Sequence, residues 1–441
     1  MGMYIKDAKI GYVFSRREAS GDTLRFVQKS TMKLEMLGTN EEFLTNLVAT
    51  TDRTLNLRSF TFDISSRKHS FYAEGKLENG VIKVEVQTGG TTETKQIPVD
   101  GEVIISPALG AWVLARSPKP DDKFKVTVFE PTLLKLIPVS ITTIGPDTLE
   151  ITGTRMPAMH FKTTLMGMTS DVWLDSLGSS IKEIQKPEVV MIRETREQAL
   201  ADIPAPAQLD LLSFFAVKSD KPVDNPRLIK ELKLLIKGMP DDAELKLSST
   251  TQSQVKTKDG VELTITIPDT SKIGRSTIPI SEPREFLASS VYIQKDNEEI
   301  RKTASQIVGQ DKDAMSAAAK LVSWVYSNLK KRATASVPSA VDVLKTREGD
   351  CNEHAILLAA LARAAGIPAK INVGLVYLNG AFYYHAWNSL YIGGTWVPVD
   401  ATFGQLPADP THVQLHEGEL DEQARVLAVV GQIEIHVISA R

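Results

Sequence analysis

The sequence predicts an α+β protein in which β-rich domains precede a core of helices packed on an antiparallel sheet. Residues 4–195 alternate apolar and polar side chains with a period of two, which is typical of strands. The period changes to three and four residues at 297–307 and 315–329, which predicts two amphipathic helices. Three strands are then predicted, at 371–377, 382–392 and 396–400.

The pattern divides the 441 residues into three domains and a linker, and about three domains are expected for this length. Residues 1–195 are expected to form one large curved antiparallel sheet with a single short helix at 106–114. Residues 196–207 contain two prolines and are interpreted as a linker. Residues 208–287, with strands expected at 211–217, 229–235, 244–247 and 261–267, are predicted to be a small β domain. Residues 288–441 are predicted to be the core.

The composition excludes several classes of protein. Lys and Arg number 51 against 54 Asp and Glu, a net charge of −3, so no basic surface for nucleic acid is expected. No stretch approaches 18 consecutive apolar residues, so no transmembrane helix is predicted. One cysteine excludes an internal disulfide and a cysteine-rich metal site.

The N-terminus, Met1-Gly2-Met3-Tyr4, carries neither a charged nor an apolar leader region, yet strand is predicted from Tyr4 onward. The expectation is therefore an exported, periplasmic protein whose leader has been removed. A cytoplasmic protein is the alternative.

The single cysteine, Cys351, opens a third predicted helix at 352–365, which Gly366 is expected to end. The free N–H groups and the dipole of a helix start favour a thiolate, so we expect an accessible thiol with a lowered pKa. Cys351 could instead be a buried structural residue, since free cysteines are commonly buried.

Two tight turns bring a histidine and an aspartate to the same place. Asn379-Gly380 and Gly393-Gly394 are suited to two-residue hairpin turns. If both turns are unbulged, Asp400 lies opposite Trp387, and His385 is its diagonal neighbour on the same face. The first hairpin places Gly374 opposite His385, where the missing side chain would leave space for the cysteine helix. A thiol, an imidazole and a carboxylate so arranged are a nucleophile, a base and an orienting group.

Residues 290–410 resemble the transglutaminase-like superfamily of papain-like cysteine enzymes. Four ordered segments carry the resemblance: Gly349-Asp350-Cys351, Ala362-Arg363-Ala364-Ala365-Gly366-Ile367-Pro368-Ala369, His385-Ala386-Trp387, and Trp396-Val397-Pro398-Val399-Asp400. The resemblance implies a papain/transglutaminase-like core in a bacterial multidomain protein. It matches Cys351 to the nucleophile, His385 to the base and Asp400 to the orienting acid. Many relatives have an acidic residue after His-x-Trp, where this chain has Asn388.

The resemblance also implies the activity, a thiol-dependent acyl transfer on peptide or protein amides. Hydrolysis by a cysteine peptidase or amidase is favoured, with cross-linking or deamidation by a transglutaminase as the alternative. A non-catalytic interaction protein with a degenerate core is the second alternative. More loosely, the β-rich region resembles half-barrel domains that precede such cores in exported bacterial proteins, and it could bind a partner or the substrate.

The remaining candidates each have an ordinary interpretation. Trp387 and Trp396 could wall a substrate cleft or cap the sheet, and Trp324 could line the cleft or fill the core. His354 is interpreted as packing behind the thiol, and a zinc site with Cys351 is disfavoured because carboxylates would have to complete it. His412 and His416 are expected in a solvated loop. No cofactor motif is present, so neither a cofactor nor a metal is expected.

Overall fold

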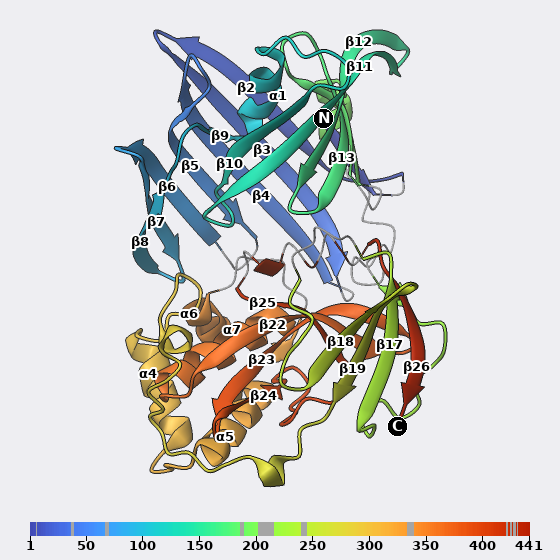
Figure 1. Ribbon diagram of the computed structural model, residues 1–441. Helices are drawn as coiled ribbons and strands as arrows, with labels where there is room; N and C mark the ends of the chain where they lie inside the picture. Colours follow the sequence, from blue (N-terminus) through green and yellow to red (C-terminus); the bar gives the residue numbers. More distant parts are fainter. Residues whose placement is uncertain are drawn as a thin grey trace. The chain divides into compact units, whose positions relative to one another are not determined.

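The computed structural model describes nearly all of the chain. The described residues are 1–5, 7–36, 39–66, 70–185, 189–201, 216–239, 245–332, 339–419, 422, 423, 426, 429 and 431–441. Figure 1 traces them from the blue N-terminus to the red C-terminus.

The chain forms two compact units. The first contains Met1–Asp210 with Ala335–Val337, and the second contains Leu211–Thr334 with Pro338–Arg441. Residues 208–287 and 288–441, which the sequence predicts as separate domains, share one sheet in the second unit, because the last strand of the chain pairs with a strand from residues 231–237.

The first unit is built on a single 15-stranded sheet, as the alternating pattern predicts. Its strand order is β8, β7, β6, β5, β4, β3, β2, β1, β15, β14, β13, β12, β11, β10, β9. All neighbours are antiparallel except β9 and β10, and β1 pairs with β15, so the two ends of the segment meet inside the sheet. The strands are β1 Gly2–Ile5, β2 Ala8–Ser20, β3 Thr23–Met36, β4 Thr39–Asp52, β5 Leu57–Ser65, β6 Ser70–Glu78, β7 Val81–Thr88, β8 Thr91–Pro98, β9 Val103–Ile105, β10 Lys123–Glu130, β11 Lys135–Ile151, β12 Thr154–Leu165, β13 Met168–Leu174, β14 Ser180–Gln185 and β15 Val189–Ile192.

The helix predicted at 106–114 is present as η1 Ser106–Ala108 followed by α1 Leu109–Leu114. A cavity of about 710 Å³ in this unit is lined by α1 and by strands that include β2, β3 and β12–β14. That volume lies in the range of small-molecule sites. Binding of a partner or substrate by this unit remains a prediction.

The second unit contains the predicted helices and core strands. Its helices are α4 Glu298–Val308, α5 Ala314–Asn328, α6 Ala340–Thr346 and α7 Cys351–Ala364, with η2 Thr270–Lys272 and η3 Arg284–Leu287 before them. The core sheet has the order β16, β23, β22, β25, and β24 pairs with β23. Its strands are β16 Val217–Lys218, β22 Ala369–Leu378, β23 Ala381–Ile392, β24 Thr395–Val399 and β25 His412–Glu417.

A second, smaller sheet in this unit has the order β18, β19, β17, β26. Its strands are β17 Glu231–Lys237, β18 Gln252–Thr257, β19 Gly260–Thr266 and β26 Glu434–Ala440. Elsewhere in the unit, β20 Lys330–Lys331 pairs with β21 Glu348–Gly349.

The prediction of a strand at 244–247 is wrong for its described part. Residues 245–247 run beside β25 without forming a strand. In the segment predicted as a linker, residues 196–200 form a short helix, α2 Arg196–Leu200, and residues 202–207 lie outside the described part, as do residues 211–215 of the next predicted strand.

Helix α7 is the centre of the second unit. It packs against β22 and β23, and α4, α5 and α6 pack around it (Figure 1). Its residues from Glu353 to Arg363 are all buried, which explains why its apolar side chains are not confined to one face. Gly366, with φ of +82°, follows its end, as predicted.

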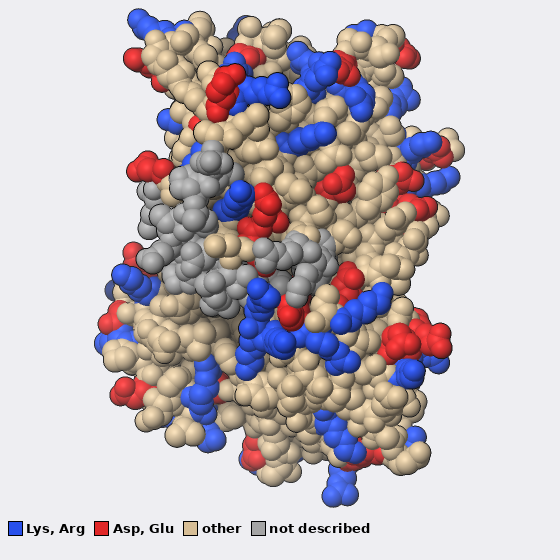
Figure 2. All heavy atoms as spheres, turned by 180° about the vertical axis from the view of Figure 1, so that it is seen from behind, with Lys and Arg blue, Asp and Glu red and all other residues tan. Residues whose placement is uncertain are grey.

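None of the helices in the described residues is both long and apolar enough to cross a membrane. On the face drawn in Figure 2, Lys and Arg side chains lie among Asp and Glu side chains, which agrees with the near-balanced composition.

Candidate active site

Asp400 accepts two hydrogen bonds at each of its carboxylate oxygens. Its side chain is 0% exposed. The residue comes directly after β24, which ends at Val399. Oδ1 accepts the backbone N–H groups of Thr402 (2.6 Å) and Phe403 (3.2 Å). Oδ2 lies 2.8 Å from Nε2 of His385 and 2.9 Å from Nε2 of His412. Burial by itself would raise the pKa of Asp400, but the two imidazoles outweigh it and hold the pKa well below its usual range.

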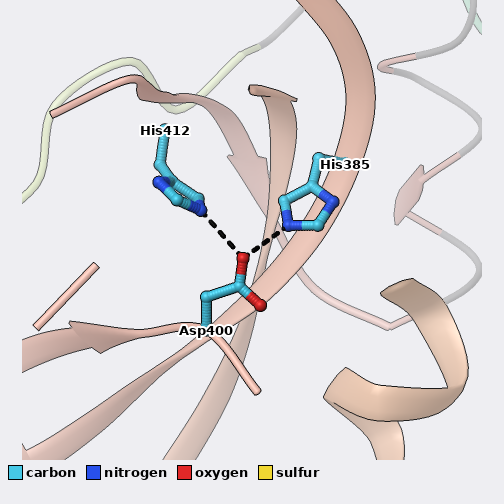
Figure 3. Close-up of side chains that lie close together, drawn as sticks. All are labelled: His385, Asp400 and His412. Carbon is cyan, nitrogen blue, oxygen red and sulfur yellow. Dashed lines mark hydrogen bonds and ion pairs between the residues drawn. The ribbon is translucent and has the colours of Figure 1, made fainter. Parts of the chain in front are cut away.

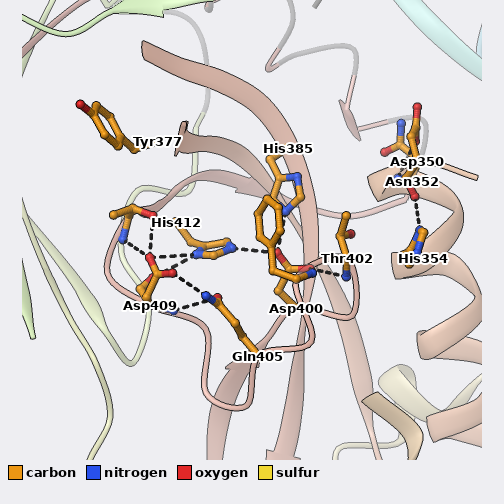
Figure 4. Close-up of polar contacts among 12 residues, drawn as sticks. Asp350, Asn352, His354, Tyr377, His385, Asp400, Thr402, Gln405, Asp409 and His412 are labelled. Carbon is orange, nitrogen blue, oxygen red and sulfur yellow. Dashed lines mark hydrogen bonds and ion pairs between the residues drawn. The ribbon is translucent and has the colours of Figure 1, made fainter. Parts of the chain in front are cut away.

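The predicted contact between His385 and Asp400 is confirmed, and so is the register from which it was derived. Asn388 pairs with Val399, and Gly374 pairs with His385. Because the carboxylate can only accept, Nε2 of His385 is the donor and Nδ1 is left as the acceptor. Figure 3 shows Nδ1 turned away from Asp400, and in Figure 4 this side of the ring faces Asp350 and Asn352 at the start of α7.

Cys351 lies between those two residues and is the first residue of α7. It is half-buried, and the backbone N–H of Ala386, the residue after His385, is hydrogen-bonded to its sulfur. The sulfur is therefore placed against β23 beside His385. The start of α7, the strand that carries His385 and the loop that carries Asp400 therefore lie beside one another.

The expectation of a lowered thiol pKa is wrong. Burial raises the pKa of the Cys351 thiol well above its usual value, and the carboxylates of Asp350 and Glu353 raise it further. Asp350 caps the N-terminus of α7, and Glu353 returns a hydrogen bond to the backbone of Asp350 at 2.9 Å. The capping box thus places two negative charges beside the sulfur. It also occupies backbone N–H groups of the first helical turn, which would otherwise stabilise a thiolate.

Alkylation of Cys351 by iodoacetamide is expected to accelerate only at alkaline pH. Its inflection should lie above the free-thiol value of about 8.5, because burial and two carboxylates disfavour the thiolate. Asp350→Asn should move the inflection to lower pH, because asparagine caps a helix as well as aspartate but carries no charge.

The matched control is Asp313→Asn, at the N-cap of α5, where the same change should leave the alkylation profile unaltered. An inflection below about 8.5 in the wild-type protein would show that an ion pair with His385 dominates over burial.

Gly374 has a different role from the one predicted. A Cβ at this position would overlap the carbonyl oxygen of Val413 and lie 2.9 Å from the backbone nitrogen of Leu415. The register of β22 against β25 shifts between Val373 and Gly374, which leaves Leu415 as the extra residue of a bulge. The missing side chain therefore accommodates β25 rather than the cysteine helix.

His412 and His416 are not in a solvated loop, and this expectation is wrong. Both lie on β25 and are only 4% and 6% exposed. Residues 246–252 cover this strand: Gln252 Nε2 donates to the carbonyl oxygen of Gln414 at 2.7 Å, and the Lys246 N–H donates to Leu415. His354 is fully buried behind the start of α7, with Nδ1 2.6 Å from the carbonyl oxygen of Asp350.

The three tryptophans proposed for the cleft have different surroundings. Trp387 is 3% exposed and stacks near His385, with ring centroids 6.0 Å apart. Trp396 contacts Tyr391 and, with Trp387, lines a cavity of about 20 Å³, which is the size of one water rather than of a peptide. On α5, the ring centroid of Trp324 lies 4.4 Å from the guanidinium carbon of Arg347. Their part in substrate binding remains a prediction.

Asn388, where many relatives carry an acidic residue, joins the sheet to the central helix. Its amide donates to the carbonyl oxygen of Ala355 in α7 at 2.9 Å, and the side chain is fully buried. A carboxylate at this position could not donate that bond. The departure from the family pattern is thus accommodated by a structural contact outside the Cys351–His385–Asp400 arrangement.

Among the described residues, one group could hold a metal ion: His385, Asp400 and His412, whose ligand atoms lie within 4.8 Å of one another. The same nitrogen and oxygen atoms are already joined by hydrogen bonds of 2.8 and 2.9 Å, which account for their approach.

Comparison with known proteins identifies one family model. Residues 301–401 match the model of the transglutaminase-like superfamily. The kyphoscoliosis peptidase of Mus musculus is 32% identical over 78 residues, which are 16% of this chain and 12% of that protein. The match therefore spans a small part of that relative.

Two solved structures have weaker overall similarity. A proposed cysteine protease from Cytophaga hutchinsonii has 23% identity and a TM-score of 0.32, with 47% of this chain and 82% of that one covered. A β-barrel-like protein of Brucella abortus, from a domain family of unknown function, has 8% identity and a TM-score of 0.35, with 44% and 95% covered.

Proposed function

Since residues 301–401 belong to the transglutaminase-like superfamily, we propose that this protein is a thiol enzyme that cleaves peptide or protein amides through Cys351, His385 and Asp400. One observation carries the proposal. The hydrogen bond from His385 to the buried Asp400 leaves Nδ1 of His385 as an acceptor on the side where Cys351 begins α7. A base so oriented beside a thiol is the arrangement that thiol acyl transfer needs.

The reaction starts from a neutral thiol and a neutral imidazole. Burial raises the pKa of Cys351, and burial also lowers the pKa of His385 despite the opposing charge of Asp400. His385 Nδ1 takes the thiol proton as Sγ attacks the carbonyl carbon, and the backbone N–H of Cys351 can stabilise the oxyanion.

The second half of the reaction returns that proton. His385 donates it to the leaving amine as the carbon–nitrogen bond breaks, which leaves a thioester on Cys351. Water, deprotonated by His385, then hydrolyses the thioester and restores the thiol. An amine in place of water would give transamidation through the same acyl-enzyme, so the acceptor alone separates hydrolysis from cross-linking.

The experiment treats the full chain with labelled casein in the presence of dansylcadaverine, and separately with a biotinylated peptidyl acyloxymethyl ketone. Casein should be cut into smaller peptides without taking up the amine, and the ketone should label Cys351. Cys351→Ala should lose both effects.

Amine incorporation without cleavage would assign the protein to cross-linking instead. Absence of labelling, cleavage and incorporation in a folded protein would support a non-catalytic core.

A further inference from the structure

His412 is a buried ionisable group that the proposed reaction does not use. Its ring lies 5.5 Å from that of His385 and 5.3 Å from that of Trp387, between centroids. Figure 3 shows His412 and His385 approaching the same oxygen of Asp400 from two sides. Asp400 therefore has two imidazole partners, of which the triad needs only one.

Both ring nitrogens of His412 have partners that can only accept. Nε2 lies 2.9 Å from Oδ2 of Asp400, and Nδ1 lies 3.0 Å from the backbone carbonyl oxygen of Asp409. An imidazole with two donating nitrogens is an imidazolium. The contacts thus define the charge of His412, whereas His385 has one donating and one accepting nitrogen.

A second carboxylate supports this charge. Oδ1 of Asp409 lies 3.6 Å from Nδ1 of His412, and Oδ2 is paired with Arg227 at 2.7 Å. Thr411 and Gln405 donate further hydrogen bonds to Asp409, and Figure 4 shows the one from Gln405. The cluster contains two carboxylates, Asp400 and Asp409, and two cations, His412 and Arg227, so its charges balance despite burial.

We propose that His412 is a positioning residue: an imidazolium at neutral pH, anchored by Asp409, that holds the carboxylate of Asp400 in the orientation that selects the reactive tautomer of His385. This role rests on the proposed function. The positive charge of His412 also limits the basicity of His385, because a nearby cation disfavours protonation of that ring. His385 is thereby kept neutral and able to take the proton of Cys351.

The charged groups around His412 act in the directions that this role requires. Burial by itself would lower the pKa of His412, but Asp400 and Asp409 outweigh it and raise the pKa to about 9. The charges of His412 and Arg227 both lower the pKa of His385. Because His412 binds its proton more tightly when folded, its stabilising contribution is complete below about pH 6.5 and is lost as the pH rises towards 9.

The test is side-chain ¹⁵N NMR of the 441-residue chain, which contains seven histidines. At pH 7 one ring should have both nitrogens protonated, should lose a proton only near pH 9, and should be absent from His412→Gln. Glutamine can still donate a hydrogen bond to Asp400 but carries no charge, so the titration of His385 should move to higher pH in this variant.

The matched control is His416→Gln, on the same strand and equally buried but paired with Glu422, which should leave the His385 titration unchanged. A neutral His412 ring in the wild-type protein at pH 7 would overturn the proposal even if the variants did not fold. An unshifted His385 titration in a folded His412→Gln protein would also overturn it.

The activity measurement separates this proposal from the proposed function. In His412→Gln, kcat/KM at neutral pH should fall by about 10- to 100-fold, as expected when a reacting group is slightly misplaced, and its acid limb should follow the His385 titration. A wild-type protein with charged His412 but no turnover would refute the function and leave the charge assignment intact. Turnover that a chelator abolishes would instead make the cluster a metal site and overturn the proposal.

Discussion

Replacement of Asp400 by asparagine is expected to reduce acyl-enzyme formation by about 10²- to 10³-fold. Asp400 accepts four hydrogen bonds, two from backbone N–H groups and two from imidazoles. An asparagine that keeps its oxygen on the backbone groups must turn its NH₂ towards His385 and His412. His385 would then have to accept through Nε2, which places a proton on Nδ1, the atom that should take the proton of the thiol. The corresponding change in a serine-protease triad costs about 10⁴ in kcat, and a thiol, being more nucleophilic, should lose less.

The measurement is a double-mutant cycle on the acylation rate with an activated ester. His385→Ala should be at least as damaging as Asp400→Asn, and the double variant should be little worse than either, because the two residues act as a unit. Ser389→Ala is the matched control: Ser389 lies on the same strand as His385 and accepts a buried hydrogen bond from Asn372 at 2.7 Å, outside the Cys351–His385–Asp400 arrangement. Additive losses, or wild-type rates in Asp400→Asn, would show that Asp400 does not orient His385.

This pair could be predicted from the sequence because two local turns determine its register. Asn379 and Gly380 have φ of +48° and +91°, and Gly393 and Gly394 have φ of +60° and +84°, as two-residue hairpin turns with positive φ at both positions require. With both turns tight, alternation along β23 and β24 is enough to bring His385 to Asp400. The position of Cys351 likewise follows from a local signal, the helix start.

His412 could not be found in this way, because its pairing with Asp400 depends on contacts that are distant in the sequence. β25 joins the sheet by pairing with β22, about forty residues earlier, through a bulge that alternation cannot foresee. The strand is buried by residues 246–252, far away in the chain, so its polar sequence resembles that of a loop. The raised pKa of the Cys351 thiol could not be predicted for a related reason: the sequence indicates the helix start, but the degree of burial there depends on the packed unit around it.

Gly374→Ala is expected to destabilise the second unit by about 3 kcal/mol, at the upper end of the usual cost of overpacking. The added methyl group would overlap the carbonyl oxygen of Val413, a backbone atom that cannot rotate away. Val373, Leu375 and Val413 are all 0% exposed, and β22 is paired on both sides, so neither strand can move without breaking the sheet. The bulge that places His412 beside Asp400 would be disturbed with it.

The single cysteine lies in the second unit, so its exposure to a thiol reagent in urea reports unfolding of that unit separately from the large sheet. The urea concentration at which Cys351 becomes fully reactive should be clearly lower in Gly374→Ala. Gly274→Ala is the matched control, because its new Cβ would lie 3.2 Å from the carbonyl oxygen of Gly393 and needs only a small adjustment at an exposed position. Equal midpoints for the two variants would mean that β25 can shift to admit a side chain at 374. The glycine would then not be needed for the bulge, and the placement of His412 would depend on its hydrogen bonds alone.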